Sequence, residues 1–190
     1  MRLNDPLVAE FEFEGIEYQI DLAFDNVLDV FDALSDPSLS EIERIELALT
    51  LLIGEYETKN GVALWNYIYE SFIHIETTKV IEYDLQGNPM PGQEDEGNEV
   101  QLIDLEKDAE YIYSSFRQAY HINLMVEQGH LHWNEFKALL NGLPSNTIMK
   151  RIMEIRGWEP KKGDSSEYRS AMNDLKKKFA LNTESGEEGE

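Results

Sequence analysis

The chain has 190 residues, 42% of them hydrophobic and 28% charged, so it is long enough for a sizeable core and has the composition of a soluble globular protein. Its 38 acidic and 16 basic residues give a net charge of −22, which argues against nucleic-acid binding and docking on anionic lipid, because both depend on Lys and Arg. The absence of cysteine excludes disulfides, Cys-ligated zinc, iron–sulfur clusters and thiol catalysis. No apolar run is long enough for a membrane span, and the N-terminus does not read as a signal peptide, so we expect a soluble cytosolic protein.

The charge is unevenly distributed along the chain. Residues 1–145 carry 7 basic and 29 acidic side chains, a net of 7 − 29 = −22. Residues 146–181 carry 9 basic and 5 acidic side chains, a net of +4, and the last nine residues add four glutamates. A charge distribution polarised in this way steers the approach of partners. We expect the basic segment to serve self-association or docking.

The N-terminal region predicts a β-hairpin. Residues 8–21 alternate between apolar and polar side chains, with Phe11 and Phe13 on one face and glutamates on the other. Glu14 and Gly15 provide a tight turn between the two strands. A lone hairpin is only marginally stable, so its apolar face is expected to pack on helices.

Two helices are predicted next, over residues 24–34 and from Ser40 to about Gly54. The second begins with a capping box, in which Ser40 and Glu43 satisfy each other's backbone N–H groups. Its apolar residues lie on nearly all sides of the helix, because Leu47 and Leu51 fall opposite the main apolar stripe. Such a helix is either central in the core or covered by a partner.

Further helices are predicted along the rest of the chain, separated by glycine, proline and polar segments. Their expected ranges are 60–75, 104–120, 132–140, 146–156 and 165–179. We therefore predict a mainly α protein, a bundle of about six to seven helices with an N-terminal β-hairpin. The predicted organisation is a single domain over residues 1–160 with a mobile acidic loop at 84–99, then a linker and basic helix at 161–181 and a disordered acidic tail at 182–190.

The sequence carries no motif for catalysis or cofactor binding. It contains no Gly-x-Gly pair, no phosphate-binding loop and no Gly-x-Ser-x-Gly elbow. Carboxylates are so abundant that close pairs arise by chance and are better interpreted as solvated surface. We predict that the protein is not an enzyme and has no cofactor.

One histidine cluster is a candidate metal site. His130 and His132 are two residues apart, with His121 and Glu135 near them in sequence. Imidazole and carboxylate groups are suitable ligands for zinc. The alternative is that His132 begins a helix and Trp133 enters the core with Phe136. We favour this alternative, because no third fixed ligand can be named, and the sequence leaves metal binding by the cluster open.

The order of several runs resembles the siphophage "gene-product-fifteen" family, which is encoded in the tail modules of phages that infect Gram-positive bacteria. The runs are Asp108–Phe116, Ala119–Leu124, Leu131–Pro144 and Ile152–Arg156. The resemblance implies a tail assembly chaperone that works in the host cell cytoplasm. Such a protein binds the tape measure protein, keeps it soluble, helps recruit tail tube subunits and is absent from the mature virion. The family brings no catalytic residues with it.

A chaperone of this kind needs an apolar groove that accepts helix faces and a charged exterior. We expect the groove on seven residues of three predicted helices: Leu47, Leu51, Trp65, Tyr69, Phe72, Trp133 and Phe136. The competing hypothesis is an acidic DNA mimic or host-protein inhibitor, which would need a regular array of carboxylates on an exposed face. The expected partners are therefore the tape measure and tail tube proteins, with no nucleic acid and no membrane.

Overall fold

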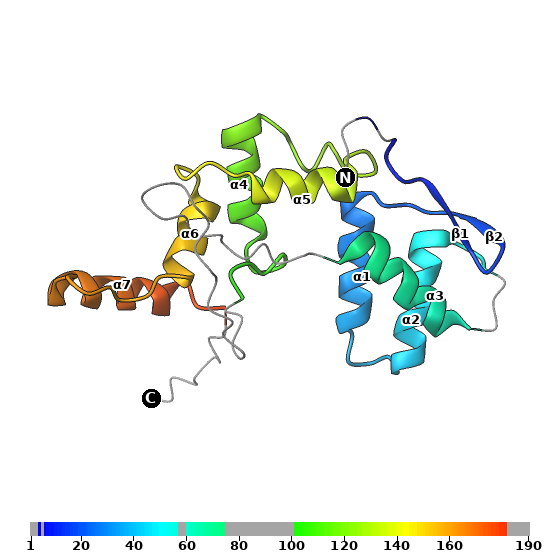
Figure 1. The fold of residues 1–190 in the computed structure, drawn as a ribbon, viewed down its shortest axis with the longest axis horizontal. Helices are drawn as coiled ribbons and strands as arrows, with labels where there is room; N and C mark the ends of the chain where they lie inside the picture. Colours follow the sequence, from blue (N-terminus) through cyan, green and yellow to red (C-terminus); the bar gives the residue numbers. More distant parts are fainter. Residues whose placement is uncertain (1–3, 5, 57–59, 75–100, 182–190) are drawn as a thin grey trace. The chain divides into compact units, whose positions relative to one another are not determined.

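The computed structural model describes residues 4, 6–56, 60–74 and 101–181. Within these residues the chain forms one β-hairpin, seven α-helices and a π-helical turn, so the prediction of a mainly α fold with an N-terminal hairpin is confirmed (Figure 1). The predicted acidic loop at 84–99 and tail at 182–190 lie outside the described residues. The contacts divide the chain into two compact units, each of which is considered by itself.

The first unit holds Met1–Ile75 and Phe116–Leu143, and the second holds Glu76–Ser115 and Pro144–Glu190. One division falls inside the helix α4 (Ala109–Tyr120). The sequence predicts a single domain over residues 1–160. This single-domain organisation stays a prediction.

The hairpin consists of β1 (Glu10–Phe13) and β2 (Ile16–Gln19), paired antiparallel with Phe11 opposite Tyr18. Glu14 and Gly15 have positive φ angles of 51° and 81°, as the mirror-image turn of a two-residue hairpin requires. Phe11 and Tyr18 are buried, and the ring of Phe11 lies 5.4 Å from that of Phe72. The apolar face therefore packs on a helical segment, as predicted.

Two antiparallel neighbours follow the hairpin, α1 (Phe24–Ser35) and α2 (Glu41–Ile53). They pack together along their lengths, and α2 also packs against α3 (Gly61–Ile68) (Figure 1). The capping box predicted for α2 is present: Glu43 N–H donates to Ser40 Oγ at 3.4 Å, and Ser40 N–H donates to Glu43 Oε2 at 2.8 Å. After α3 the helix continues as the π-helical turn Tyr69–Ile73.

The helix α5 (Trp133–Asn141) joins the core of the first unit through its N-terminus. Phe24 N–H donates to the Leu131 carbonyl at 2.9 Å, and Trp133 N–H donates to the Leu22 carbonyl at 2.7 Å. These two bonds fix the starts of α1 and α5 side by side, although the segments are more than 100 residues apart in sequence.

The second unit is built from the first part of α4, α6 (Ile148–Arg156) and α7 (Ser166–Lys178). The expected start of α4 at Asp104 was wrong: Asp104 Oδ1 accepts from Glu106 and Lys107 N–H, which caps a separate turn, and the helix begins at Ala109. The turn also places Asp108, whose buried carboxylate pairs with Arg156.

Arg156 connects four segments of the second unit. Its Nη1 and Nη2 donate to the Asp108 carboxylate at 2.5 and 2.8 Å. Nη1 also donates to the Leu102 carbonyl at 2.9 Å, and Nε donates to the Phe179 carbonyl at 2.7 Å. Arg156 is 6% exposed and Asp108 1% exposed, so this is a buried, bidentate ion pair.

Candidate partner-binding surface

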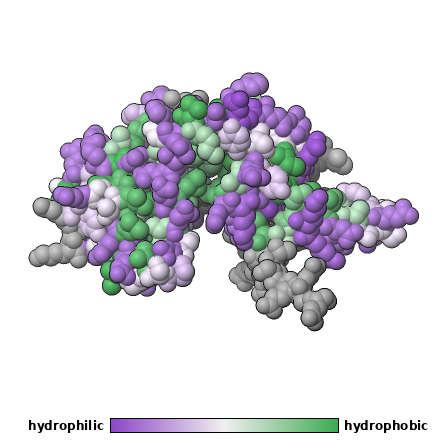
Figure 2. Space-filling view, turned by 180° about the vertical axis from the view of Figure 1, so that it is seen from behind, coloured by the Kyte–Doolittle hydropathy of each residue, from purple (hydrophilic) through white to green (hydrophobic). Residues whose placement is uncertain are grey.

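Leu47 is exposed on the outer side of α2. The helix buries Ala48, Leu49 and Leu52, whereas Leu47 is 39% exposed and Leu51, one turn further on, is half-buried. Residues four apart lie on the same side of a helix, so these two leucines form one short apolar strip. Figure 2 shows hydrophobic side chains reaching the surface on one face of the molecule.

The predicted aromatic residues of α3 and the π-helical turn are less accessible. Trp65 is buried, with its ring 5.7 Å from that of Tyr69, and Tyr69 is half-buried. Phe72 is also half-buried and contacts Phe11 of the hairpin. In this conformation Phe72 therefore helps to hold the hairpin on the helices.

Trp133 and Phe136 lie inside the first unit rather than at the edge of a groove. Trp133 is fully buried, and its Nε1 donates to the Ile73 carbonyl at 2.9 Å. Its ring stacks on Phe136 with centroids 5.5 Å apart, and Phe136 stacks in turn on Phe24 at 5.1 Å. The alternative for Trp133, entry into the core with Phe136, is the one observed.

The seven predicted residues therefore do not form one continuous surface. Leu47 is exposed, Leu51, Tyr69 and Phe72 are half-buried, and the remaining three are buried. A partner that contacts this conformation reaches the leucine strip first. Partner binding at all seven positions stays a prediction.

Three exposed apolar residues of α2 and α3 were missed. Ile42 is 65% exposed, Val62 48% and Tyr67 39%. Leu47 was predicted because it is an apolar residue that lies away from the main buried stripe of its helix. The same criterion would also have identified Tyr67. Ile42 continues the apolar spacing of the buried residues of α2, but it lies in the first turn, where the end of the helix leaves it uncovered.

Two acidic residues of α2 lie near the leucine strip: Glu43 is one turn before Leu47, and Glu46 directly precedes it. The hydrogen bond with the Ser40 hydroxyl, together with that from the Ser40 backbone, lowers the pKa of Glu43 below its usual 4.5. Glu46 lies in the same helix and, after burial, is the second cause that raises the pKa of Tyr56. At neutral pH negative charge therefore lies beside the strip, and Glu43 stands in the first turn of α2, where the helix dipole favours an acidic side chain.

Within the histidine cluster, the His132 ring makes hydrogen bonds to backbone groups. His132 caps α5: its Nδ1 accepts from Asn134 N–H at 3.1 Å, and its Nε2 lies 3.2 Å from the Val8 carbonyl. The two contacts together fit a neutral ring with the proton on Nε2. In the part of the chain that the structure describes, no group of three His, Asp or Glu residues is arranged to hold a metal ion. The prediction of no cofactor remains a prediction.

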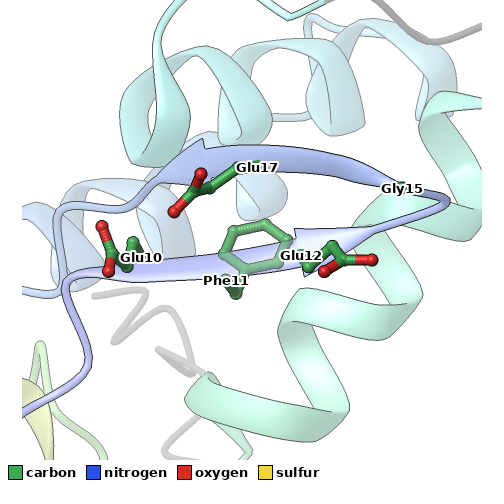
Figure 3. A pocket seen from close by; sticks show the side chains of 5 residues that line it. All are labelled: Glu10, Phe11, Glu12, Gly15 and Glu17. Atoms are coloured by element: carbon green, nitrogen blue, oxygen red, sulfur yellow. The ribbon is translucent and has the colours of Figure 1, made fainter.

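The outer face of the hairpin is acidic. Glu12 lies opposite Glu17 and Glu10 opposite Gln19 in the register of the strands, and all four are exposed. Figure 3 shows the three glutamates around a shallow hollow beside Phe11 and Gly15. The facing carboxylates of Glu12 and Glu17 repel each other and add to the negative field. Gln19 Nε2 donates to Glu10 Oε2 at 3.0 Å and joins the two strands.

These features define a mainly α protein with an acidic hairpin and apolar side chains exposed on its helices. A family model described as "Bacteriophage Gp15 protein" matches residues 3–181, and the chain belongs to this family. The family indicates a phage structural or assembly-related protein. No curated protein and no solved structure matches the chain. Among the described residues, no helix is both long and apolar enough to cross a membrane.

Proposed function

We propose that the chain is a tail assembly chaperone of a siphophage that infects a Gram-positive bacterium, and that it acts in the host cytoplasm without enzymatic activity. In this role it binds the tape measure protein, keeps that protein soluble, helps recruit tail tube subunits and leaves before the virion is complete. The observation that carries the proposal is the match to a phage protein family over residues 3–181, nearly the whole chain.

The surface of α2 supports the proposal physically. Leu47 and Leu51 offer an apolar strip of the kind that an amphipathic helix covers with its own apolar face. Glu43 and Glu46 border the strip, and the chain as a whole carries a charge of −22. Copies bound along an apolar, helical partner would therefore repel other complexes and keep the partner dispersed.

Co-expression with the tape measure protein tests the proposal. The wild-type chain should raise the soluble fraction of the tape measure protein, and Leu47→Asp combined with Leu51→Asp should abolish this effect. Val126→Asp is the matched control, because it also replaces an apolar side chain, 68% exposed, by a carboxylate. Leu47→Asp alone keeps the test valid if the double variant folds poorly, since Leu47 lies on the surface.

The proposal fails if the wild-type chain leaves the solubility of the tape measure protein unchanged. If Leu47→Asp behaves like Val126→Asp while circular dichroism shows a folded chain, the partner binds elsewhere, and the leucine strip is not the site.

The acidic hairpin face favours a second candidate, an acidic mimic of DNA that blocks a host protein. Exposed Glu10, Glu12 and Glu17 lie within a few residues of one another on this face. Binding that depends on them would weaken strongly as salt is raised, and would be lost in Glu12→Gln with Glu17→Gln. Partner binding that tolerates salt and is lost in Leu47→Asp supports the chaperone instead.

A further inference from the structure

The helix α7 carries an apolar stripe that the described part of the chain covers only in part. Tyr168, Met172 and Leu175 follow a four–three spacing, which the C-cap residue Phe179 continues by a further four. This is the spacing of the a and d positions of a coiled coil. No residue of α7 is buried, and Tyr168 and Leu175 are 48% and 36% exposed.

Contacts at the ends and along one flank hold α7 in place. Ser165 Oγ accepts from Tyr168 N–H at 3.1 Å and caps the helix. Arg169 donates to the Lys161 carbonyl and Lys176 to the Trp158 carbonyl, each at 2.8 Å. The edge of Trp158 meets Tyr168 with centroids 6.0 Å apart. Phe179 contacts Tyr111 with ring centroids 6.3 Å apart, and its carbonyl accepts from Arg156 Nε at 2.7 Å. These contacts hold both ends of α7 and leave Leu175 and about half of Tyr168 exposed.

An amphipathic helix usually gains its stability by burying its apolar face, because a helix of this length is marginal in water. In α7 that gain is only partly used within the described part of the chain, because Tyr168 and Leu175 stay exposed. A partner that covers the exposed part of the stripe would therefore bury further apolar surface.

The charges beside the stripe indicate the kind of partner. The residues that directly follow Tyr168 and Leu175 are Arg169 and Lys176, which occupy the e positions that flank an a/d seam. Over the whole helix, four cations stand against two acids, a net of 4 − 2 = +2: Arg169, Lys176, Lys177, Lys178, Glu167 and Asp174. Each flanking cation has hydrogen-bond donors beyond the one it gives to the 158–161 segment.

An antiparallel second copy of α7 fits this surface poorly. In an antiparallel pair, e positions face e positions, so Arg169 of one copy would lie near Lys176 of the other. The acidic end of this chain does not fit either, because residues 182–190 contain no apolar side chain to cover the stripe. An apolar helix with acidic flanks fits better, because its apolar face would cover the stripe and its carboxylates would pair with Arg169 and Lys176.

We propose that α7 is a docking surface for an amphipathic helix of another protein, with apolar a and d positions and Asp or Glu beside them. The inference does not depend on the proposed chaperone role, since the leucine strip of α2 belongs to the other unit.

Binding of two designed peptides to the full chain tests the inference. Both are labelled 21-residue helices with Leu at a and d; one has Glu at every e and g position, and the other has Lys there. The Glu peptide should bind at least about tenfold more tightly than the Lys peptide at low salt, a difference of about 1.4 kcal/mol. Raising the salt should narrow the difference.

Variants of α7 locate the site. Leu175→Asp should weaken binding of the Glu peptide by about tenfold or more, whereas Ser170→Asp, an exposed position on the opposite side of α7, should leave it nearly unchanged. Arg169→Glu combined with Lys176→Glu should reverse the preference in favour of the Lys peptide. Leu47→Asp should have no effect, which separates this surface from the leucine strip.

Three results would overturn the inference: equal or undetectable binding of the two peptides, binding that Leu175→Asp leaves intact, or a wild-type dimer in sedimentation that Leu175→Asp dissociates. The last would assign the stripe to a second copy of the chain. Every substituted position in α7 is exposed or half-buried, and circular dichroism of each variant checks that its helix content is unchanged.

Discussion

Replacing Arg156 by methionine removes the side chain that connects four segments of the second unit. Methionine fills a similar space but cannot donate to Asp108 or to the carbonyls of Leu102 and Phe179. It leaves the Asp108 carboxylate, 1% exposed, without its cation. The variant therefore tests whether this ion pair holds the unit together.

The expected loss in free energy of unfolding follows from the burial of the ion pair rather than from the number of hydrogen bonds that are lost. Removing one partner of a buried ion pair typically costs about 3–5 kcal/mol, because the other charge stays desolvated and uncompensated. That is a large share of the roughly 5–15 kcal/mol by which a whole domain is stable. Arg156→Met and Asp108→Asn should both fall in this range. The double variant Asp108→Leu with Arg156→Met should cost less than either, since no buried charge remains.

Urea denaturation gives the free energy of unfolding of each variant, and hydrogen exchange read by mass spectrometry shows where the structure opens. Exchange should rise in α6 and in the first turns of α4 in Arg156→Met, and stay at the wild-type level in α1 and α2 of the first unit. A loss below about 1 kcal/mol would refute the reasoning, because that is the range of exposed ion pairs. A double variant less stable than both single variants would also refute it.

Four further outcomes are expected. Ser40→Ala should lower stability by about 1 kcal/mol in thermal unfolding, through loss of the N-cap. The pKa of Glu43 is lowered in the folded state, so its carboxylate stabilises the fold above pH 4.5 and ceases to do so as the pH falls through the folded-state pKa. The difference in melting temperature between wild type and Glu43→Gln should therefore disappear in acid. A difference that grows in acid would show that the pKa of Glu43 is not lowered by folding. Trp133→Phe should cost about 2–3 kcal/mol in urea, from the cavity and from the Ile73 carbonyl left without its donor, and a cost under 0.5 kcal/mol would be incompatible with full burial. Gly15→Ala should cost about 1 kcal/mol because φ is +81°, and Gly15→Asn should cost less; equal losses would show that the turn relaxes.

Local features of the fold could be predicted because they depend on a few neighbouring residues. The Glu14-Gly15 turn and the Ser40 capping box follow from backbone conformation and from hydrogen bonds within four residues. The start of α4 could not be predicted, although Asp104 is a good capping residue. Asp104 caps a separate turn, and the carboxylate of Asp108 is directed to Arg156, 48 residues further on.

The candidate surface depended on tertiary packing and was harder to predict. Helical spacing alone does not distinguish Leu47, which solvent reaches, from Trp133, which α5 carries into the core. Similarly, the abundance of carboxylates favours solvated surface as the interpretation of any one of them, whereas Asp108 is buried against Arg156. In each case the deciding information is which element lies opposite, and that is not a property of the local sequence.

The most direct test of the proposed function is co-purification of the tape measure protein with the tagged chain from cells that express both. We predict a stable complex that survives 0.5 M salt, because apolar contacts at the leucine strip do not weaken as salt rises. We also predict that Leu47→Asp loses the complex while Val126→Asp retains it. A wild-type chain that brings down no tape measure protein at any salt concentration would contradict the assignment as its chaperone.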